Sequence, residues 1–427
     1  MTAEMVAGLG SAFSEFTRSF GHLFGRKPTF DHFKSYCHGL LSDLPRKSVE
    51  PIALASGCAV RTLQEFLTHH RWEFGDLRDE LQRRIAREHL PAPGSRAGEV
   101  IGLVDETSVA KKGDKTPGVQ RQHCGASGKT DNCIVTVHLA VSCGSFRTLI
   151  DSDLYLPQKT WHEDRDRCRA AHIPADVVYK AKWQLGIDQI RRAISNGIRF
   201  DWITFDEDYG GKPQFLSDLD ALGQLYIGEV PSNFVCWPSL PKYHSLQGPF
   251  RPKRVDNAIR WGKPFRGQAW KRYSLSRQTC APQTWEVRAA QVWLQRPKTT
   301  TSHRCRPTQR MYWLIAARNL SNGEIKYFIS NAPPKTAIKK LLKVAFSRWS
   351  VEHVFRVSKT EIGLDHYEGR TYCGLMRHMT LCSLMMLFIA VQTTVLRGEK
   401  SGVVGIDDGA DCPSIERALS PLAASAP

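Results

Sequence analysis

Over roughly the first 95 residues, hydrophobic and polar positions follow the spacing of helices. Ser48 stands where a helix would be capped, and Pro51 falls in the first turn, where a missing N–H costs nothing. Residues 52–55 and 60–67 are predicted to form two short helices joined by a tight turn. The pair resembles a helix-turn-helix, although any helical hairpin with glycine at its turn gives the same pattern.

After a turn-rich break at residues 91–95, short apolar runs indicate strands, separated by stretches with helical spacing. The predicted order is strand, strand, strand, helix, strand, helix, strand, over residues 100–104, 134–142, 146–156, 181–196, 202–205, 213–222 and 225–230. That order is the one found in RNase H-like α/β cores. The later elements are strands at 311–318 and 325–330 and helices at 336–362 and 375–396.

The apolar run from Leu381 to Leu396 contains Gln392, Thr393 and Thr394 and is shorter than the ~20 residues that a membrane span needs. We therefore expect a buried core helix there and no membrane partner. The 12 cysteines are scattered without a CxxC pair, and no secretory or other targeting segment is evident. They are expected to be reduced side chains, not disulfides or zinc ligands.

With 41% hydrophobic and 24% charged residues, the composition is that of a globular protein, but its charge of +17 is unevenly distributed. Residues 241–310 hold 16 Lys and Arg and two acids, Asp256 and Glu286, a net charge of +14. Such an excess favours a nucleic-acid partner, although a solvated basic face or linker has a similar composition. Aromatic residues among the charges argue against disorder: Trp261, Trp270, Tyr273, Trp285 and Trp293.

Two aspartates follow short apolar strands in equivalent local settings. Asp105 follows Ile-Gly-Leu-Val, and Asp206 follows Trp-Ile-Thr-Phe. A carboxylate at a strand end points from a rigid element into the crevice where sites form on open α/β sheets. If neighbouring strands bring the two together, their repulsion makes a divalent cation the natural partner. Taken singly, each aspartate is equally compatible with a helix cap or a turn.

The predicted helix at 336–362 carries a third acid, Glu352, four residues after Arg348 and seven before Lys359. These intervals place the three residues along one stripe of a helix. An acid among basic residues suits a site that binds metal and phosphate together. Spacing alone favours the simpler interpretation, a surface stripe of ion pairs worth a few tenths of a kcal/mol each.

Three blocks of the sequence, in order, resemble the DDE transposases of bacterial insertion sequences, and more narrowly the insertion sequence 701 type. The blocks are Val104-Asp105-Glu106-Thr107-Ser108, Phe205-Asp206-Glu207-Asp208-Tyr209-Gly210 and Arg348-Trp349-Ser350-Val351-Glu352-His353-Val354-Phe355, the last continuing through Lys359, Gly363-Leu364-Asp365-His366-Tyr367-Glu368 and Arg377-His378. The family's Arg-x3-Glu-x6-Lys arrangement is met by Arg348, Glu352 and Lys359. Ala345 stands where a tyrosine often precedes the arginine by three positions. The resemblance covers roughly residues 40–395.

The resemblance implies an α/β fold with an RNase H-like (retroviral-integrase-like) catalytic core, interrupted by a β-rich insertion and preceded by a helical domain. The expected division is an N-terminal helical DNA-binding domain at 1–95, the first part of the core at 96–230, the basic β-rich insertion at 231–310, the second part of the core with the catalytic helix at 311–397, and a disordered tail at 398–427. The basic segment would then interrupt the core.

The resemblance also implies metal-dependent DNA cleavage at transposon ends, followed by strand transfer through attack of the 3′-OH on target DNA. Asp105, Asp206 and Glu352 are the expected catalytic and metal-binding residues, holding two Mg²⁺ or Mn²⁺ ions. Phosphate contacts are expected from Arg348, Lys359, Arg251, Lys253, Arg254, Lys271 and Arg272. Accessory roles are open to Tyr209, to His366 and to Trp261, since a tryptophan in the insertion would stack on an unpaired base in a DNA hairpin.

The expected partners are the terminal inverted repeats of a transposon and the target DNA, bound by a homodimer in the bacterial cytoplasm at the nucleoid. Glu207 and Asp208 compete for the second acidic position, and Glu361 and Glu368 compete for the third. Two other functions stay open: an RNase H-like nuclease or resolvase that cuts without joining, and a transposase-derived DNA-binding protein without catalysis. The intact acids disfavour the last of these.

Overall fold

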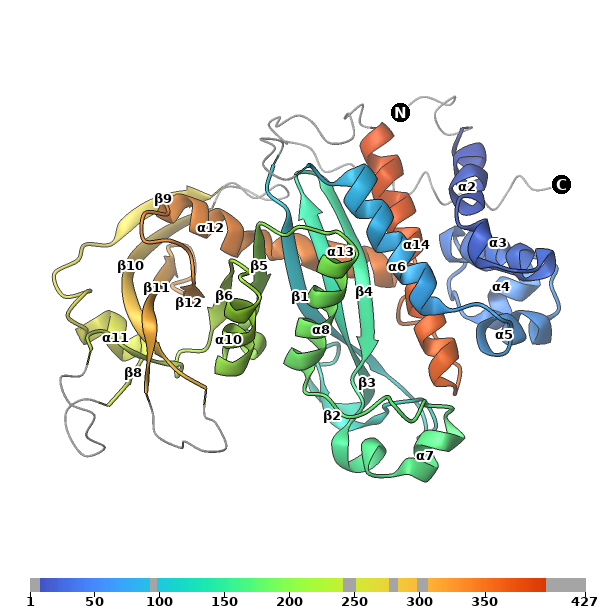
Figure 1. Cartoon of the computed structure of the whole chain (residues 1–427), viewed down its shortest axis with the longest axis horizontal. Coiled ribbons are helices and arrows are strands. Elements are labelled where there is room, and N and C mark those ends of the chain that lie inside the picture. Colours follow the sequence, from blue (N-terminus) through green and yellow to red (C-terminus); the bar gives the residue numbers. More distant parts are fainter. Residues whose placement is uncertain (1–7, 93–97, 241–250, 276–282, 298–305, 397–427) are drawn as a thin grey trace.

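The computed structural model of the chain describes residues 8–92, 98–240, 251–275, 283–297 and 306–396, without the side chains of residues 283 and 349–352. Its fold is mixed α/β, with two β-sheets and helices on their faces (Figure 1). One sheet lies at the centre of Figure 1, with the N-terminal helices on its right and the second sheet on its left. The tail expected at residues 398–427 lies outside the described residues.

The N-terminal region is helical, as the sequence predicts. Its elements are α2 (Leu9–Arg18), a 3-10 turn (Gly21–Leu23), α3 (Lys27–Leu41), α4 (Val49–Ala55), α5 (Val60–Thr68), α6 (Phe74–Arg84) and a π-helical turn (Ile85–His89). The predicted pair of short helices is confirmed in α4 and α5. Leu63, Phe66 and Leu67 are buried on one side of α5, so its apolar stripe packs this helix into the domain.

The central sheet has five strands, which are β1 (Ile101–Ala110), β2 (Gln120–Cys124), β3 (Lys129–Cys143), β4 (Phe146–Leu154) and β5 (Trp202–Phe205). β3 pairs antiparallel with β1, β2 and β4, and β1 pairs parallel with β5. β1 therefore lies between β3 and β5. The strands predicted at 134–142, 146–156 and 202–205 are confirmed, whereas β2 is an addition to the predicted order.

β1 is longer than predicted. The apolar run at 100–104 predicts a strand that ends before Asp105, but β1 continues to Ala110 and places Asp105 in mid-strand. The continuation pairs with β3, from Asp105 opposite His138 to Ala110 opposite Cys133. An apolar run marks only the part of a strand that is buried on both faces. Beyond it, the ladder to β3 holds more polar residues in the same strand.

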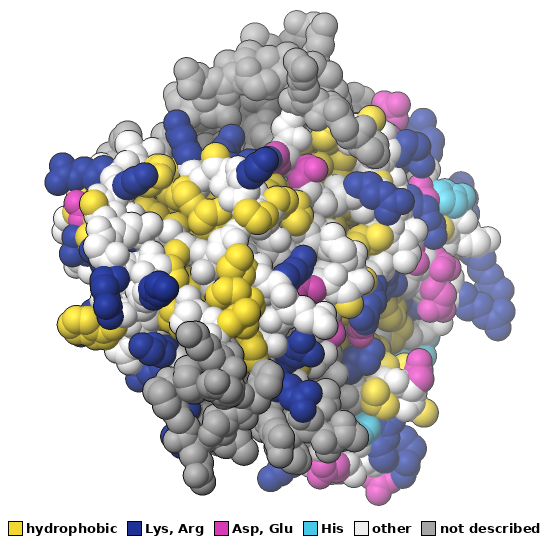
Figure 2. All heavy atoms as spheres, turned by 60° about the vertical axis from the view of Figure 1, so that its left-hand side comes forward, with side chains coloured by type: hydrophobic (Ala, Val, Ile, Leu, Met, Phe, Trp, Pro, Cys, Tyr) yellow, Lys and Arg dark blue, Asp and Glu magenta, His cyan; other side chains and the backbone are white. Residues whose placement is uncertain are grey.

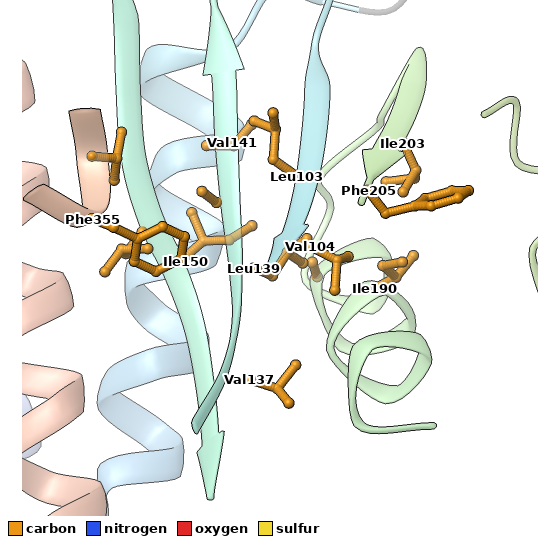
Figure 3. Close-up of a cluster of buried hydrophobic side chains, with 14 of the residues drawn as sticks. Leu103, Val104, Val137, Leu139, Val141, Ile150, Ile190, Ile203, Phe205 and Phe355 are labelled. Atoms are coloured by element: carbon orange, nitrogen blue, oxygen red, sulfur yellow. The ribbon is translucent and has the colours of Figure 1, made fainter. Parts of the chain in front are cut away.

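Helices cover both faces of the central sheet. On one face lies α8 (Lys182–Ser195), where a Cβ on Gly186 would fall 2.9 Å from Val104, so glycine allows the helix to approach β1. On the other face lie α13 (Trp349–Thr360) and α14 (Tyr372–Leu396). Figure 3 shows Ile190 of α8 on the side of Val104 and Phe205, and Phe355 of α13 near Ile150. A short helix, α7 (Arg165–Ala170), precedes α8, and a π-helical turn (Gln158–His162) precedes α7.

The second sheet has seven strands, which are β6 (Ile227–Val230), β7 (Val235–Trp237), β8 (Lys253–Arg254), β9 (Lys271–Leu275), β10 (Gln283–Gln295), β11 (Pro307–Asn319) and β12 (Ile325–Ser330). Their order is β6-β12-β11-β10-β7-β8, with β9 paired to β10. Three helices accompany the sheet, α9 (Glu207–Gly210), α10 (Pro213–Ala221) and α11 (Val255–Trp261). The strands predicted at 311–318 and 325–330 are confirmed as β11 and β12.

The two sheets meet beside β6. Tyr226 forms a parallel bridge with Ile203 of β5, while β6 itself pairs antiparallel with β12. The expected limit of the insertion at residue 310 falls inside β11, which pairs with β10 on both sides of that position. β11 is therefore a continuous strand across this position.

The region predicted as one helix at 336–362 forms two, α12 (Ile338–Ser347) and α13. Arg348 separates them, yet it keeps helical angles of φ −52° and ψ −34°. Phe346 of α12 packs against Trp285 and Phe328 of the second sheet, with ring centroids 4.7 and 5.5 Å apart. Because α12 packs on the second sheet and α13 on the first, Arg348 falls at the junction of the two.

Among the described residues, α14 is the one helix long and apolar enough to cross a membrane, but 61% of its most apolar window is buried in the protein. It packs against β4 and against α3, α5 and α6. This is the burial of the core helix that the sequence predicts. Nine cysteines, spread over the described residues, are free thiols, in agreement with the expected reduced state.

Arg377 connects α14 to the N-terminal helices. It is 4% exposed, and its guanidinium donates to the backbone carbonyls of Phe66, His70 and Trp72. The guanidinium carbon also lies 4.5 Å from the centre of the Trp72 ring, a favourable cation–π distance. This contact explains an arginine in an otherwise apolar helix.

Replacing Arg377 by methionine is expected to lower the free energy of unfolding by about 3 kcal/mol, because buried carbonyl groups lose a charged donor. Urea denaturation followed by circular dichroism measures the change. Arg370 is exposed and provides the control, since Arg370→Met should cost less than about 0.5 kcal/mol. Equal losses in the two variants would show that Arg377 is not an anchor.

Candidate active site

The register of β1 and β5 places Asp105 beside Asp206. Val104 pairs with Phe205 in this parallel ladder, and each aspartate directly follows one of these two residues in the sequence. Neighbouring strands are about 4.8 Å apart, so the backbones carrying these acids are held close together. Asp206 directly follows β5, as predicted, whereas Asp105 is fixed on its other side by pairing with β3.

Asp206 also caps a helix. It is the N-cap of α9 and accepts backbone hydrogen bonds from Asp208, at 3.0 Å, and from Tyr209, at 3.3 Å. The pKa of Asp206 is nevertheless raised to about 7, first by burial, then by the negative charges of Asp105 and Asp208, while Arg348 opposes the shift. Asp206 therefore both caps α9 and belongs to the acid pair with Asp105. The local structure does not fully balance the negative charge of its carboxylate.

Arg348 lies between acids of the two sheets. Its guanidinium is 4.0 Å from a carboxylate oxygen of Asp105 on β1 and 3.9 Å from one of Glu229 on β6. Both distances exceed those of hydrogen bonds, so these contacts are electrostatic. Arg348 is thus shared between Asp105 and Glu229, an acid that no sequence motif marks.

The face of α13 that packs on the sheet is defined by Phe355, whose ring lies 5.3 Å from that of His138. His138 is opposite Asp105 in the β1–β3 ladder, and paired residues share a face of the sheet. Position 352 lies three residues before Phe355, on the same face of the helix. The side chain of Glu352 is outside the described residues, so the structure places this position through its backbone alone.

His138 is fully buried between hydrogen-bonding hydroxyls. Its Nε2 and Nδ1 lie 2.7 Å from the hydroxyls of Thr136 and Ser152. Burial, together with the smaller effect of the positive charge of Lys359, lowers the pKa of His138 to about 3. The imidazole is therefore neutral at physiological pH, and Lys359 of α13 lies near enough to the sheet to influence it.

Tyr209 and Gly210 pack α9 against its surroundings. Tyr209 is 2% exposed, and burial together with nearby acids raises the pKa of its hydroxyl well above the ordinary value. That hydroxyl has no hydrogen-bond partner among the described residues. A Cβ on Gly210 would lie 1.9 Å from the carbonyl oxygen of Glu229, so glycine is required where α9 meets β6.

The remaining predicted residues lie elsewhere. His366 accepts a hydrogen bond from the backbone N–H of Lys47 and lies against the α3–α4 connection, and burial lowers its pKa. Around β8 and β9, five predicted basic residues are exposed: Arg251, Lys253, Arg254, Lys271 and Arg272. Trp261 is 64% exposed on α11.

The acids that compete for the second and third positions have other surroundings. Glu207 and Asp208 are exposed on α9, Glu361 directly follows α13, and Glu368 pairs with Arg46.

Glu229 is the site residue that the sequence does not reveal. It lies within β6, outside every recognised block, and only the pairing of β6 with β12 and the position of Arg348 bring it to the site. Glu106, which lies in the first recognised block, is bound by Lys182 of α8 at 2.8 Å. Both acids have lysine partners, Lys326 for Glu229 and Lys182 for Glu106.

Asp105 and Asp206 have the chemistry of a divalent-cation site. Two adjacent carboxylates, one with a strongly raised pKa, leave negative charge that a hard cation with oxygen ligands would balance. Within the described side chains, no three His, Cys, Asp or Glu residues form a metal-binding group, and Glu352 is not among those side chains. The two aspartates therefore fit a metal such as Mg²⁺ as part of a larger ligand set.

Known proteins resemble the chain across this region. A family model described as DDE superfamily endonuclease matches residues 19–286, which include both aspartates. The chain belongs to this family. A protein of Microchaete diplosiphon named "Probable transposase for insertion sequence element IS701" is 33% identical over 234 residues, or 54% of this chain and 56% of that protein. The chain thus matches little more than half the length of this relative.

A solved structure, the NurA nuclease from Sulfolobus solfataricus, is matched over 68% of this chain and 92% of its own. The TM-score is 0.25 and the sequence identity 10%, a likeness too low to define the fold. The family assignment of this DDE superfamily endonuclease therefore depends on sequence similarity and on the site.

The raised pKa of Asp206 predicts a stability that depends on pH. The folded state, with a pKa of about 7, holds the proton more tightly than the unfolded state, with a value of 3.8. Without divalent metal, stability should therefore fall as pH rises from about 4 to about 7, and then stay level. Asp206→Asn keeps an acceptor for the α9 cap and removes the charge, so at pH 8 it should gain at most about 4 kcal/mol over the wild type.

Thermal unfolding in a metal chelator at pH 4 and pH 8 measures this difference. Glu207→Gln, at the exposed neighbouring position, is the control and should leave stability unchanged at both values. An Asp206→Asn protein that is no more stable than the wild type at pH 8 would contradict the unbalanced charge.

Proposed function

We propose that the protein is a DDE transposase that cleaves DNA at transposon ends and joins the freed 3′ ends to target DNA. The observation that carries the proposal is the pair Asp105 and Asp206, held side by side by the β1–β5 register, with the pKa of Asp206 raised to about 7. Family membership supports an endonuclease, and the relative named as an insertion-sequence transposase supports transposition. Two copies of the chain, one for each transposon end, are the proposed assembly.

The central sheet is proposed to be an RNase H-like core of the retroviral-integrase type. Its order β4-β3-β1-β5, with β1 antiparallel to β3 and parallel to β5, supports this assignment. The proposed domains remain the helices at 1–95, the core at 96–230, the insertion, and the core with the catalytic helix. The pairing of β11 and β12 with β10 and β6 supports ending the insertion after β12, not at residue 310.

Asp105, Asp206 and Glu352 are the proposed ligands of Mg²⁺ or Mn²⁺, with two ions at the site. When bound, the metal would supply the positive charge that activates a water or a 3′-OH and stabilises the leaving oxygen. Asp105 and Asp206 would bind from rigid strands, which hold their oxygens in place. Arg348 and Lys359 would hold DNA phosphates, the arginine with its planar fork and the lysine as a compact charge.

The outer part of the second sheet is the proposed DNA-binding surface. Arg272, Glu286 and Arg318 lie side by side on β9, β10 and β11, and Glu286 pairs with both arginines. Two guanidinium groups, those of Arg288 and Arg318, lie 4.9 and 4.8 Å from the Trp270 ring. Figure 2, in which this side comes forward, shows many Lys and Arg side chains around hydrophobic ones and few acids. Such a surface suits the phosphates of DNA.

Two further DNA contacts are proposed. Trp261 alone is exposed among the described tryptophan side chains, which leaves its ring available to stack on an unpaired base. The α4–α5 pair is the second contact, and Arg61 on α5 has an 87% exposed side chain there. Both would lie outside the acid pair and would orient DNA instead of reacting with it.

Loss of one metal ligand should abolish cleavage without loss of DNA binding. With a plasmid that carries the gene and its flanking genomic DNA, Asp206→Asn should cleave at least about a hundredfold more slowly in Mg²⁺, more than the loss of an outer group usually costs. A gel shift should give an unchanged affinity. Cleavage at the wild-type rate would remove Asp206 from the site, and wild-type cleavage without joining of a pre-cleaved 3′-OH end would indicate a nuclease or resolvase.

DNA binding by the second sheet should depend on salt through its arginines. Arg318→Gln is expected to weaken binding and to reduce the slope of log affinity against log salt by about 1, as the loss of one phosphate contact does. Arg191→Gln is a matched control, because Arg191 is also an exposed arginine paired with an acid, on α8. Equal slopes for Arg318→Gln and the wild type would exclude this surface.

A further inference from the structure

The exposed face of α12 carries only positive charge. Lys339, Lys340 and Lys343 are exposed along the helix, and Lys335 is exposed in the turn that precedes it. No acid occurs in the sequence from 331 to 351. A solvent-exposed helix face ordinarily mixes both signs, so that its charges pair along the helix. The face of α12 therefore differs from an ordinary solvated surface.

Two of these lysines on α12 have no described acid to offset their charge. Lys339 and Lys340 lie in the first turn, where positive charge is unfavourable because the helix N-terminus is itself partly positive. Glu99 pairs with Lys340 at 2.7 Å, whereas Lys339 and Lys343 form no ion pair among the described residues. Like charges four residues apart also repel each other. The fold gains no stability from these two charges, which favours a role in binding a polyanion.

The other face of α12 is buried, so the lysines project from a fixed support. Its buried residues are Leu341, Leu342, Val344, Ala345 and Phe346. The helix contacts β5 and β6, and Figure 1 shows it running from the second sheet toward the central sheet, where α13 continues. Lys339 and Lys343 are about 6 Å apart along the axis, and Lys343 is about 7.5 Å before Arg348. The lysine face therefore leads toward the junction where Arg348 lies 4.0 Å from Asp105.

This face is separate from the arginines proposed above to bind DNA. Trp285 of β10 packs against Phe346 of α12, with ring centroids 4.7 Å apart, while the next residue, Glu286, pairs with Arg272 and Arg318. Successive side chains of a strand point to opposite faces of the sheet. The lysines of α12 and these arginines therefore lie on opposite sides of the second sheet, and a DNA duplex on one side leaves the other side free.

We propose that the lysine face of α12, formed by Lys335, Lys339 and Lys343, binds the phosphates of target DNA and leaves the arginine side of the second sheet to the transposon end. The inference rests on the proposed function, which brings two DNA molecules to one acid pair. A lysine is a compact charge on a flexible stem, and its phosphate contacts carry no sequence information. Such contacts suit a target duplex that is bound without regard to its sequence.

The test is the full-length protein with Lys339→Gln and Lys343→Gln combined. For a duplex that lacks the transposon ends, the slope of log affinity against log salt should fall by about 2, as the loss of two phosphate contacts does. Cleavage at the transposon ends should keep the wild-type rate. Joining of a pre-cleaved 3′-OH end to an unrelated plasmid should fall by about tenfold, because it alone needs the target duplex.

A second double variant controls for the general loss of positive charge. Lys129→Gln with Lys159→Gln also removes two exposed lysines that form no ion pair among the described residues, on the β2–β3 hairpin and the turn before α7. It should bind and join DNA like the wild type. Thermal unfolding without DNA provides a check on folding, because the α12 double variant should be at least as stable as the wild type. An equal loss of joining in both double variants would overturn the proposal.

The outcomes also distinguish this inference from the proposed function. If the wild type cleaves and joins while the α12 double variant keeps the wild-type slope and joining, the lysine face alone is wrong. If the double variant loses cleavage as much as joining, the face binds the transposon end and its assignment to target DNA is wrong. If the slope falls by about 2 but the wild type neither cleaves nor joins, the DNA contact is supported and transposition is not.

Discussion

The parallel pairing of β1 with β5 is the constraint on which the site depends. Its register makes Asp105 and Asp206 neighbours although 100 residues lie between them. The backbone hydrogen bonds of the ladder hold them there, so neither carboxylate takes part in the pairing. The cost is electrostatic, since burial first, and then the repulsion of the neighbouring acids, raises the pKa of Asp206 to about 7. Because the fold keeps these repelling carboxylates together, a bound cation would be stabilised between them, which is the property that a phosphoryl-transfer site requires.

Other described residues near the acid pair modify its negative charge. Arg348 brings one positive charge, but Glu229 shares it, and Lys326 in turn neutralises Glu229. Across the sheet, His138 stays neutral because it is buried, so it adds no second cation beside Asp105. Among the described side chains, the acid pair thus has one nearby arginine, which Glu229 shares.

Much of this was predictable, and the exceptions have physical causes. Apolar runs and helical spacing predicted most core elements, and the strand end at Phe205 placed Asp206 correctly. The extension of β1 beyond Asp105 was missed, because ladder bonds to β3 and not hydrophobicity keep those residues extended. Glu229 was missed for a related reason, since its role arises from the pairing of β6 with β12, which no local pattern encodes.

The junction at Arg348 shows why the two sheets act as one unit. α12 packs on the second sheet through Phe346 and also contacts β5, while α13 packs on the first sheet through Phe355, so Arg348 lies where both helices and both sheets meet. That residue carries the charge shared by Asp105 and Glu229. The two sheets are therefore joined at the site in two ways, by the bridge between Ile203 and Tyr226 and by this one arginine side chain.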